Sequence, residues 1–458
     1  MSLLASPARR RLLQRLAVAP ALMGAPALLG GMGTVTAAGA GDYRALLVLF
    51  LNGGNDGHNC LVPTDAAYGD YQRARRELAL SRSSLLPLAG ASAGHSFGLH
   101  PALAPLVPLY NSGRLAWIAN VGPLVEPATA LQVLDGRVEV PPFLLSHSDQ
   151  VAIQQGWGAT EDPSGWAGRL LEELPDGMRH ARAACSFGHA RTLVQGRRTP
   201  VSHLEADLGG SRYWGDVDVA HPEWVWTREL TRLARLQSPN AYAAEYGRTL
   251  DAAITDAAAM VEAYAAGITP SADFGSGLLA TSLRTLATML PGFKALGYRR
   301  QVFLLNWGGF DTHANQRGSL QTTQDAQLAL VSLALAGFDA ANRASGLDAD
   351  VATLVMTDFG RTLRPVSGGG SDHAWGNHWW AVGGPIAGRQ VAGTFPTLTL
   401  GGPDDADHGR GGHFVPTTAT DQVAATFARW LGLPDDRLGT VFPLLSNFAR
   451  PTVDLLHG

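Results

Sequence analysis

Short, continuous runs of apolar residues recur along this chain and constrain its fold more than any other feature. They are Ala45–Leu51, Leu115–Val121, Gln301–Asn306, Val351–Thr357 and Trp379–Val382. Runs without polar alternation are typical of strands buried on both faces, as in a parallel sheet. Helical patterns lie between them, at Asp65–Leu80, Pro101–Asn111, Asp149–Leu174, Ala241–Ala265, Leu278–Leu296, Leu320–Ala344 and Ala419–Leu431. The alternation predicts an α/β fold, a three-layer sandwich with a largely parallel central sheet.

The composition indicates one elaborated globular domain. Of the 458 residues, 46% are hydrophobic and 16% are charged, which is too apolar for a disordered chain. The formal net charge of -4 gives no basic footprint for nucleic acid, so we exclude that partner. We predict a single domain over residues 41–458. Its polar and aromatic stretch at about residues 188–230 has no clear periodicity and indicates an irregular excursion at the edge of the core or a lid on the substrate side.

The first 40 residues have the features of an export signal. Arg9, Arg10 and Arg11 precede an apolar, Gly- and Ala-rich run, and residues 38–40 offer a small-residue cleavage site; this pattern is typical of a twin-arginine signal peptide. Prolines and glycines interrupt the stretch Val18–Val35, which disfavours a membrane anchor. We therefore expect a periplasmic or secreted protein with no integral membrane segment after signal removal.

Polar residues gather directly after the predicted strands. In open α/β sheets, ligands bind beyond the carboxyl ends of the strands, and Asp oxygens and His nitrogens are ligands for Zn²⁺ or Mn²⁺. We therefore predict a site for one or two divalent ions, built from Asp56, Asp311, His313, Asp358, Asp372, His373 and His378. For each acid alone, turn chemistry is the alternative, because an Asp after a strand often caps a helix or closes an Asx-turn.

Three further residues are candidates for catalysis. Ser146 precedes the predicted helix from Asp149, so it would lie where backbone N–H groups stabilise anions, either as a nucleophile or as a simple N-cap. His147 is a metal ligand, a general acid or a core histidine. Arg361, one turn after Asp358, either holds an ester anion through two hydrogen bonds or pairs with a structural carboxylate.

Several segments of the chain resemble, in the same order, the bacterial exported family known as domain of unknown function 1501. They are LVLFLNGGNDGHNCLVP, FGLHPALAPL, SHSDQ, GGFDTHANQ, TDFGRT, SDHAWGNHWWAVGG and VPTTATDQVAATFARWLGL. That family is placed by fold within the alkaline phosphatase and sulfatase superfamily. The resemblance therefore implies an alkaline-phosphatase-like fold and a two-metal hydrolase of phosphate, phosphonate or sulfate esters, with a Ser, Thr or formylglycine nucleophile.

The same resemblance implies metal-ligand roles at four matching positions: Asp56, Asp311, His313 and Asp358. The chain departs from the superfamily pattern at Phe359, which stands where a ligand histidine would be. His373, or the pair Asp372 and His373, could complete that subsite, and His378 could supply the histidine that the superfamily carries last.

The sequence thus predicts an exported metal-dependent hydrolase of phosphate or sulfate esters, acting on a small-molecule or glycan ester. Phe359 favours the alternative, a non-catalytic exported binding or assembly protein on a hydrolase scaffold. A third interpretation is a serine esterase, because Gly90–Gly94 matches G-x-S-x-G around Ser92. That motif needs a strand before it and a helix after it, whereas the preceding run is short and contains Pro87.

Overall fold

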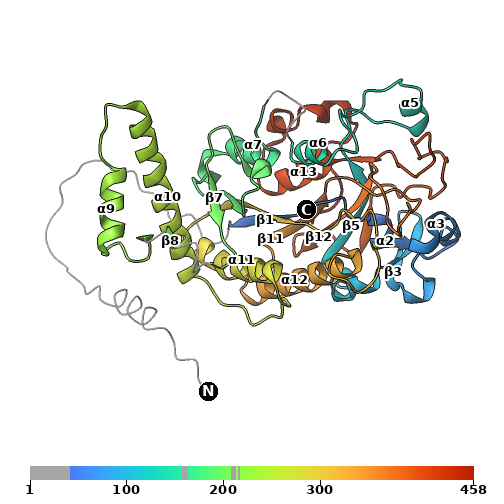
Figure 1. Cartoon of the computed structure of the whole chain (residues 1–458), viewed down its shortest axis with the longest axis horizontal. Coiled ribbons are helices and arrows are strands. Elements are labelled where there is room, and N and C mark those ends of the chain that lie inside the picture. The colour runs from blue at the N-terminus through green and yellow to red at the C-terminus, as the bar shows by residue number, and fades with distance from the viewer. Residues whose placement is uncertain (1–41, 157–161, 208–212, 215–216, 458) are drawn as a thin grey trace, which may run out of the picture. The chain divides into compact units, whose positions relative to one another are not determined.

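The computed structural model describes residues 42–156, 162–207, 213–214 and 217–457, so the export signal predicted for residues 1–40 lies outside the described residues. Within these ranges the largest element is a sheet with the strand order β13-β5-β12-β11-β1-β10-β6-β7, and β14 lies beside β5 (Figure 1). In that order the strands span Gln390–Ala392, Leu115–Gly122, Asn377–Gly383, Val351–Thr357, Arg44–Leu51, Arg300–Trp307, Ala184–Phe187 and Val201–Leu204, and β14 spans Thr418–Ala419.

The apolar runs of the sequence all form strands of this sheet, as predicted. β1 lies at its centre and is parallel to β10 on one side and to β11 on the other, so that Leu49 faces Leu305 and Val355. β12 is antiparallel to β11 and to β5. The other pairings among the described strands of this sheet are parallel. The prediction of a largely parallel central sheet is therefore confirmed.

Helices cover both faces of the sheet (Figure 1). Leu47, Leu49 and Leu51 of β1 belong to one buried cluster with α11 and α12, whereas the alternate residues from Leu46 to Phe50 belong to another cluster with α7 and α13. The four helices span Leu278–Ala295, Gln324–Ala344, Trp166–Glu173 and Thr420–Trp430. Burying each large apolar side chain stabilises the fold by about 1.5–3 kcal/mol. The strand is apolar throughout because it serves two cores, which confirms the three-layer α/β sandwich.

Two predicted helices are broken where the chain cannot continue a regular helix. The segment Pro101–Asn111 forms a 3-10 helix, η3 (Pro101–Leu106), followed by α4 (Val107–Asn111), because its prolines lack the N–H that an α-helix needs. The segment predicted from Asp149 contains two helices, α6 (His147–Gln154) and α7. Gly156, with φ of +90°, ends the first of these.

The described residues also contain several short α-helices and 3-10 helices. They are α2 (Gly57–Cys60), α3 (Tyr68–Arg75), η1 (Arg76–Leu78), η2 (Arg82–Ser84), α5 (Ala130–Leu134), η4 (Asp176–Met178), η5 (Thr192–Val194), η6 (Asp435–Arg437), α14 (Leu438–Val441) and η7 (Pro443–Asn447). None of the helices in the described ranges combines the length and apolar character needed to cross a membrane.

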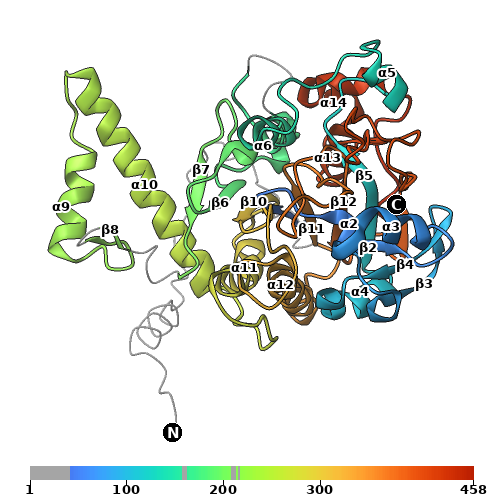
Figure 2. The ribbon, with the colours of Figure 1, turned by 45° about the vertical axis from the view of Figure 1, so that its right-hand side comes forward.

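The stretch predicted as an irregular excursion contains more regular structure than its periodicity indicates. β7 joins the main sheet, parallel to β6, and Leu193 and Val194 of η5 are fully buried. β8 (Tyr213–Trp214) and β9 (Val217–Asp218) pair with each other. α9 (Val225–Ala234) is followed by α10 (Ala241–Ala265), which packs against α9 and returns to the sheet edge formed by β7, so that the two helices project beyond this edge (Figure 2). The strand was missed because four residues are too few to show a period.

The G-x-S-x-G segment lies in a β-hairpin rather than a nucleophile elbow. β3 (Leu86–Ser92) and β4 (His95–Leu99) pair antiparallel, and β2 (Leu61–Pro63) adds a third strand. The Ser92 hydroxyl accepts a hydrogen bond of 2.8 Å from the Val391 N–H. A strand therefore follows Ser92 where the elbow requires a helix, and the esterase interpretation is set aside.

Candidate metal centre

The carboxyl ends of β1, β10 and β11 meet at one edge of the sheet, where ligands of α/β proteins commonly bind. The loops that follow these strands carry Gly53, Asp311 and Asp358. The loop before β12 adds Asp372 and His373. It is held against the turn after β11, since the Thr362 N–H donates to the Asp372 carbonyl at 2.9 Å and the Ala374 N–H donates to the Gly360 carbonyl at 2.8 Å.

Three histidine side chains converge on one carboxylate. The Nε2 atoms of His147, His313 and His373 lie 3.4, 3.0 and 3.4 Å from Oδ1 of Asp311. The Nε2 atoms of His313 and His373 are 3.0 Å apart, and Nδ1 of His313 lies 3.5 Å from Asp372. Ligand atoms of a tetrahedral zinc site, with bonds of about 2.0–2.1 Å, are about 3.3 Å apart. These donors form two overlapping groups that could each hold a cation: His147, Asp311 and His373 in one, and His313, Asp372 and His373 in the other.

Two of these histidines are oriented by their second ring nitrogen. Nδ1 of His147 lies 2.7 Å from Oδ2 of Asp358, and the Asp358 oxygens accept the Gly53 N–H at 3.0 and 3.1 Å. Nδ1 of His373 donates to the Leu145 carbonyl oxygen at 2.7 Å. In the neutral rings this leaves the lone pair on Nε2, the arrangement that carboxylates and carbonyls impose on metal-bound histidines. Nε2 of His147 is buried and has no hydrogen-bond partner among the described residues, so the donor set fits a metal ion.

The charges of the cluster also suit a cation. Burial acts to raise the pKa of Asp311, but the hydrogen bond and charge of Arg361 outweigh it and lower that pKa to about 2. Burial lowers the pKa of His373. The hydrogen bond to Asp358 raises the pKa of His147, against the opposing effect of burial. At neutral pH Asp311 is therefore ionised and His373 is neutral, the forms in which both bind metals.

Phe359 forms the floor beneath two of the candidate ligands. Its side chain is fully buried, and its ring centre lies 4.7 Å from that of His147 and 4.6 Å from that of His373. A Cβ atom at Gly54 would approach the Phe359 ring to 2.5 Å, so glycine is required there. The position that would carry a ligand histidine under the superfamily resemblance is thus occupied by a ring that restrains two neighbouring imidazoles.

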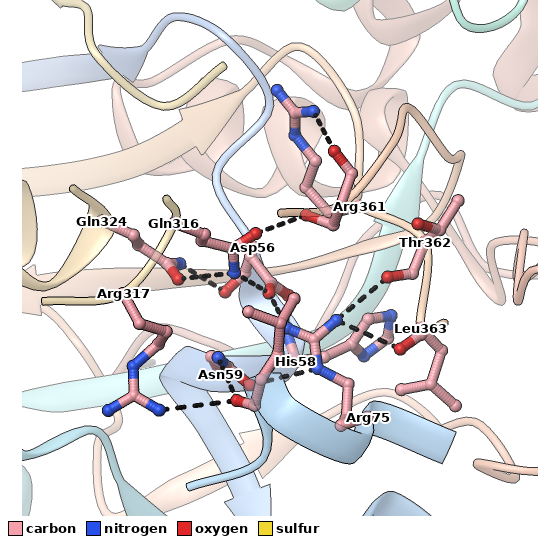
Figure 3. Close-up of polar contacts among 12 residues, drawn as sticks. Asp56, His58, Asn59, Arg75, Gln316, Arg317, Gln324, Arg361, Thr362 and Leu363 are labelled. Atoms are coloured by element: carbon pink, nitrogen blue, oxygen red, sulfur yellow. Dashed lines mark hydrogen bonds and ion pairs between the residues drawn. The ribbon is translucent and has the colours of Figure 1, made fainter. Parts of the chain in front are cut away.

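Asp56 does not join this cluster. Its Oδ1 atom accepts the His58 N–H at 3.1 Å and so caps α2. Its Oδ2 atom accepts a hydrogen bond from Gln316 and pairs with Arg75, and neither partner of that ion pair has any exposed side-chain surface (Figure 3). In this structure Asp56 is a structural acid that joins the end of β1 to α3, and the turn-chemistry alternative describes it better than the ligand hypothesis.

His378 is likewise placed as a core histidine on β12. Its Nδ1 atom accepts the Asn120 N–H at 3.1 Å, and its ring stacks on Phe395 at a centroid distance of 4.8 Å. Among the described residues, the groups placed to hold a metal ion are His147 with Asp311 and His373, and His313 with Asp372 and His373, and neither includes His378. Its predicted role as the last ligand therefore receives no support from its position.

Arg361 and Ser146 have partners other than those of the catalytic prediction. Arg361 is fully buried and donates to the carbonyls of Gly54 and Ser371 at 2.8 and 2.9 Å, besides its ion pair with Asp311. These bonds agree with the structural alternative rather than an anion contact. Ser146 occupies the N-cap position of α6, and its hydroxyl bonds to the Asp149 carboxylate. No hydrogen bond among the described residues joins that hydroxyl to the cluster.

Sequence reasoning missed two backbone groups that support this arrangement: the Gly53 N–H, which holds Asp358, and the Leu145 carbonyl, which orients His373. The signal for one was present in the glycines after the first strand. Gly53 has φ of +112°, and a Cβ atom there would lie 2.4 Å from the Asp311 backbone nitrogen; only glycine permits this approach. The Leu145 carbonyl carries no comparable signal.

The protein is therefore an α/β sandwich that carries a histidine–carboxylate cluster, a candidate metal centre, at the carboxyl edge of its sheet. The family model for proteins of unknown function DUF1501 matches residues 43–407, and the chain belongs to this family. No curated protein matches the chain.

Among solved structures, similarity extends to the crystal structure of the lipoteichoic acid synthase LtaP from Listeria monocytogenes. The identity is 10% and the TM-score 0.28, over 70% of this chain and 57% of that chain. The chain thus spans little more than half of the synthase, and a TM-score this low does not establish a shared fold.

Proposed function

We propose that this protein is a metal-dependent hydrolase of phosphate or sulfate esters, with Zn²⁺ or Mn²⁺ in a site of one or two ions. The observation that carries the proposal is the convergence of three imidazole Nε2 atoms on Asp311. The Asp311 side chain is 48% exposed and that of His313 45% exposed, so a substrate from solution has access to the cluster.

A divalent ion at this place would polarise an ester oxygen and lower the pKa of a bound water. The residues of the chain prepare the site for that ion. Asp358 and the Leu145 carbonyl fix the tautomers of His147 and His373, and the buried ring of Phe359 excludes water from beneath them. Because the Ser146 hydroxyl is engaged with Asp149, we propose water rather than Ser146 as the attacking group.

The proposed substrate is a small-molecule or glycan ester, and the proposed place of action is the periplasm or the cell exterior. Support for that location comes from the arginines and the small-residue cleavage site of the first 40 residues. A fusion of residues 1–40 to a reporter protein tests it: export should require Arg9, Arg10 and Arg11, and export that survives their replacement by lysine would contradict the proposal.

The enzymatic proposal is tested by metal content and turnover in the same preparations. Purified protein is assayed for bound metals, then for hydrolysis of p-nitrophenyl phosphate, bis(p-nitrophenyl) phosphate and p-nitrophenyl sulfate, before and after chelation. Asp311→Ala should lose both metal and turnover, whereas Ser146→Ala, the matched control, should keep both. Full activity in metal-free protein would refute the proposal.

A second function, that of a non-catalytic binding or assembly protein, is favoured by Phe359, which replaces a potential ligand with a buried ring. It predicts stoichiometric metal without turnover of any of the three esters. Under this alternative, Asp311→Ala would lose the metal, and neither the unmodified protein nor this variant would hydrolyse any of the three esters.

A further inference from the structure

The helices α9 and α10 form an antiparallel hairpin whose internal contact is small. Residues 235–240 connect the two helices, and a Cβ atom at Gly247 would lie 2.7 Å from the Ala234 carbonyl oxygen, so the backbones are close at that point. The buried residues of this part of the hairpin are Thr227, Ala234, Gly247 and Leu250, which include a single large apolar side chain. Because helices in proteins are stabilised mainly by the packing of an apolar face, the hairpin by itself receives little of this stabilisation.

One flank of the hairpin carries large apolar side chains that are exposed. Successive helical residues are rotated by about 100°, so that, counted from the buried residues, Trp226 and Leu233 lie on one side of α9, and Tyr242 and Tyr246 lie on one side of α10. Since the helices run antiparallel and side by side (Figure 2), these two sides form the same flank. The four side chains are 70%, 51%, 88% and 67% exposed, in that order. We call this surface the aromatic flank.

The charges of the hairpin are balanced. By the same rotation Arg235 and Asp251 lie on the opposite flank, and their side chains form an ion pair at 2.7 Å. Arg232 pairs with Glu229 at 2.7 Å. Residues 224–265 contain four arginines and no lysine against five acids, so the hairpin has no excess of positive charge for an anionic membrane surface. The aromatic flank is therefore better suited to a protein partner.

The apolar area of the aromatic flank matches one side of a symmetric dimer interface. A large aromatic side chain presents about 150–250 Å², so at the exposures given the three aromatic residues and the leucine leave roughly 500 Å² uncovered. A standard interface buries about 800 Å² on each partner, and about 65% of a homodimer interface is apolar, which also gives roughly 500 Å². Thr249 and Ala253, small and exposed, continue the flank along α10, so a partner helix can approach closely there.

We propose that the aromatic flank binds the same flank of a second copy of this chain, so that two hairpins form a four-helix bundle across a two-fold axis. A two-fold interface uses one patch twice. Here each copy offers bulky rings, Tyr242 and Tyr246, together with the small residues Thr249 and Ala253 that can receive them. Burial of the rings against the second hairpin supplies the helix packing that one hairpin lacks. The inference does not depend on the proposed hydrolase activity.

Sedimentation equilibrium of the full chain, at protein concentrations from the nanomolar to the micromolar range, tests the inference. We expect twice the protomer mass at micromolar concentration. Trp226→Glu and Tyr246→Glu, one on each helix, should each weaken dimerisation at least about 100-fold, because each substitution occurs twice in the interface and replaces an aromatic anchor by a buried charge. Both positions are exposed in the protomer, so the circular dichroism spectra of the variants should be unchanged.

Leu131→Glu is the matched control, since it introduces the same charge at an exposed leucine of α5 and should leave the dimer intact. Increased salt should not dissociate the dimer, because salt screens charges rather than apolar contacts. Flotation with phosphatidylglycerol vesicles tests a lipid partner, and we expect no bound protein. A monomer at every concentration, a dimer as stable in both glutamate variants as in the unmodified protein, or vesicle binding that Trp226→Glu abolishes would overturn the inference.

Discussion

Asp56 and Asp311 follow neighbouring strands, yet the structure places them in opposite settings, and matched substitutions test this difference. Asp56→Asn removes the charge partner of Arg75 in an ion pair with no exposed side-chain surface. Breaking a buried pair on one side costs about 3–5 kcal/mol. Arg75 keeps its bonds to the Thr362 and Leu363 carbonyls at 3.0 and 3.3 Å, so we expect a loss near the lower limit, about 3 kcal/mol.

Asp311→Asn should cost less stability. The Asp311 side chain is 48% exposed, so solvent screens its charge, and exposed pairs contribute about 0.2–1 kcal/mol. Arg361 retains its backbone acceptors, the carbonyls of Gly54 and Ser371. The metal, by contrast, should be lost, because Asp311 is the oxygen on which the three histidines converge.

Urea unfolding, followed by tryptophan fluorescence in the presence of a chelator, measures the first difference without the stabilisation that a bound metal would add. Metal analysis after dialysis against Zn²⁺ or Mn²⁺ measures the second. The expected outcome is a destabilised Asp56→Asn that binds metal and a stable Asp311→Asn that does not. A stable Asp56→Asn without metal would show that Asp56 is a ligand and refute this reasoning.

Three further perturbations have defined outcomes. Asp358→Asn removes the carboxylate that orients His147 and should weaken metal binding about 10–100-fold in competition with a chromophoric chelator, while the exposed control Asp435→Asn should not. Phe359→Ala should cost about 3–5 kcal/mol in urea unfolding and also weaken metal binding; unchanged metal affinity would contradict its role as a floor for the histidines. Burial raises the folded-state pKa of Asp421 to about 6, against the charge of Arg169; this lies above the pKa of an unfolded Asp, so the stability gained from its protonation is complete below about pH 4 and is lost as the pH rises through 6. The shift of about two pKa units corresponds to up to about 3 kcal/mol. Asp421→Asn should therefore be more stable than the unmodified protein at pH 8 and similar to it at pH 4; an equal difference at both values would contradict the assignment.

The strands of the sheet were predictable because their signal is local. Each of the residues Ala45–Leu51 exposes at most 1% of its surface, and a strand that packs on both faces must be apolar at every position. The helix boundaries were less accurate where prolines interrupt a periodic pattern, as in Pro101–Asn111, because a 3-10 turn tolerates what an α-helix does not.

The candidate site was predictable in its chemistry and only partly in its membership. Acids and histidines that follow parallel strands lie at one edge of a sheet, and Asp311, His313, Asp372 and His373 do gather there. Asp56 satisfies the same sequence criterion but meets Arg75. Spacing along the chain cannot distinguish these cases, since the difference depends on which side chain another element places beside the acid.

The sequence by itself determined that the chain forms an α/β sandwich and that metal-binding residue types follow its strands, because burial pattern and residue chemistry are properties of short segments. Only the tertiary structure decided that His147 faces Asp358, 211 residues away, that Phe359 supports two histidines, and that Asp56 is neutralised by a buried arginine. Those outcomes depend on strand order and on the directions of side chains after packing, which arise from contacts between distant segments.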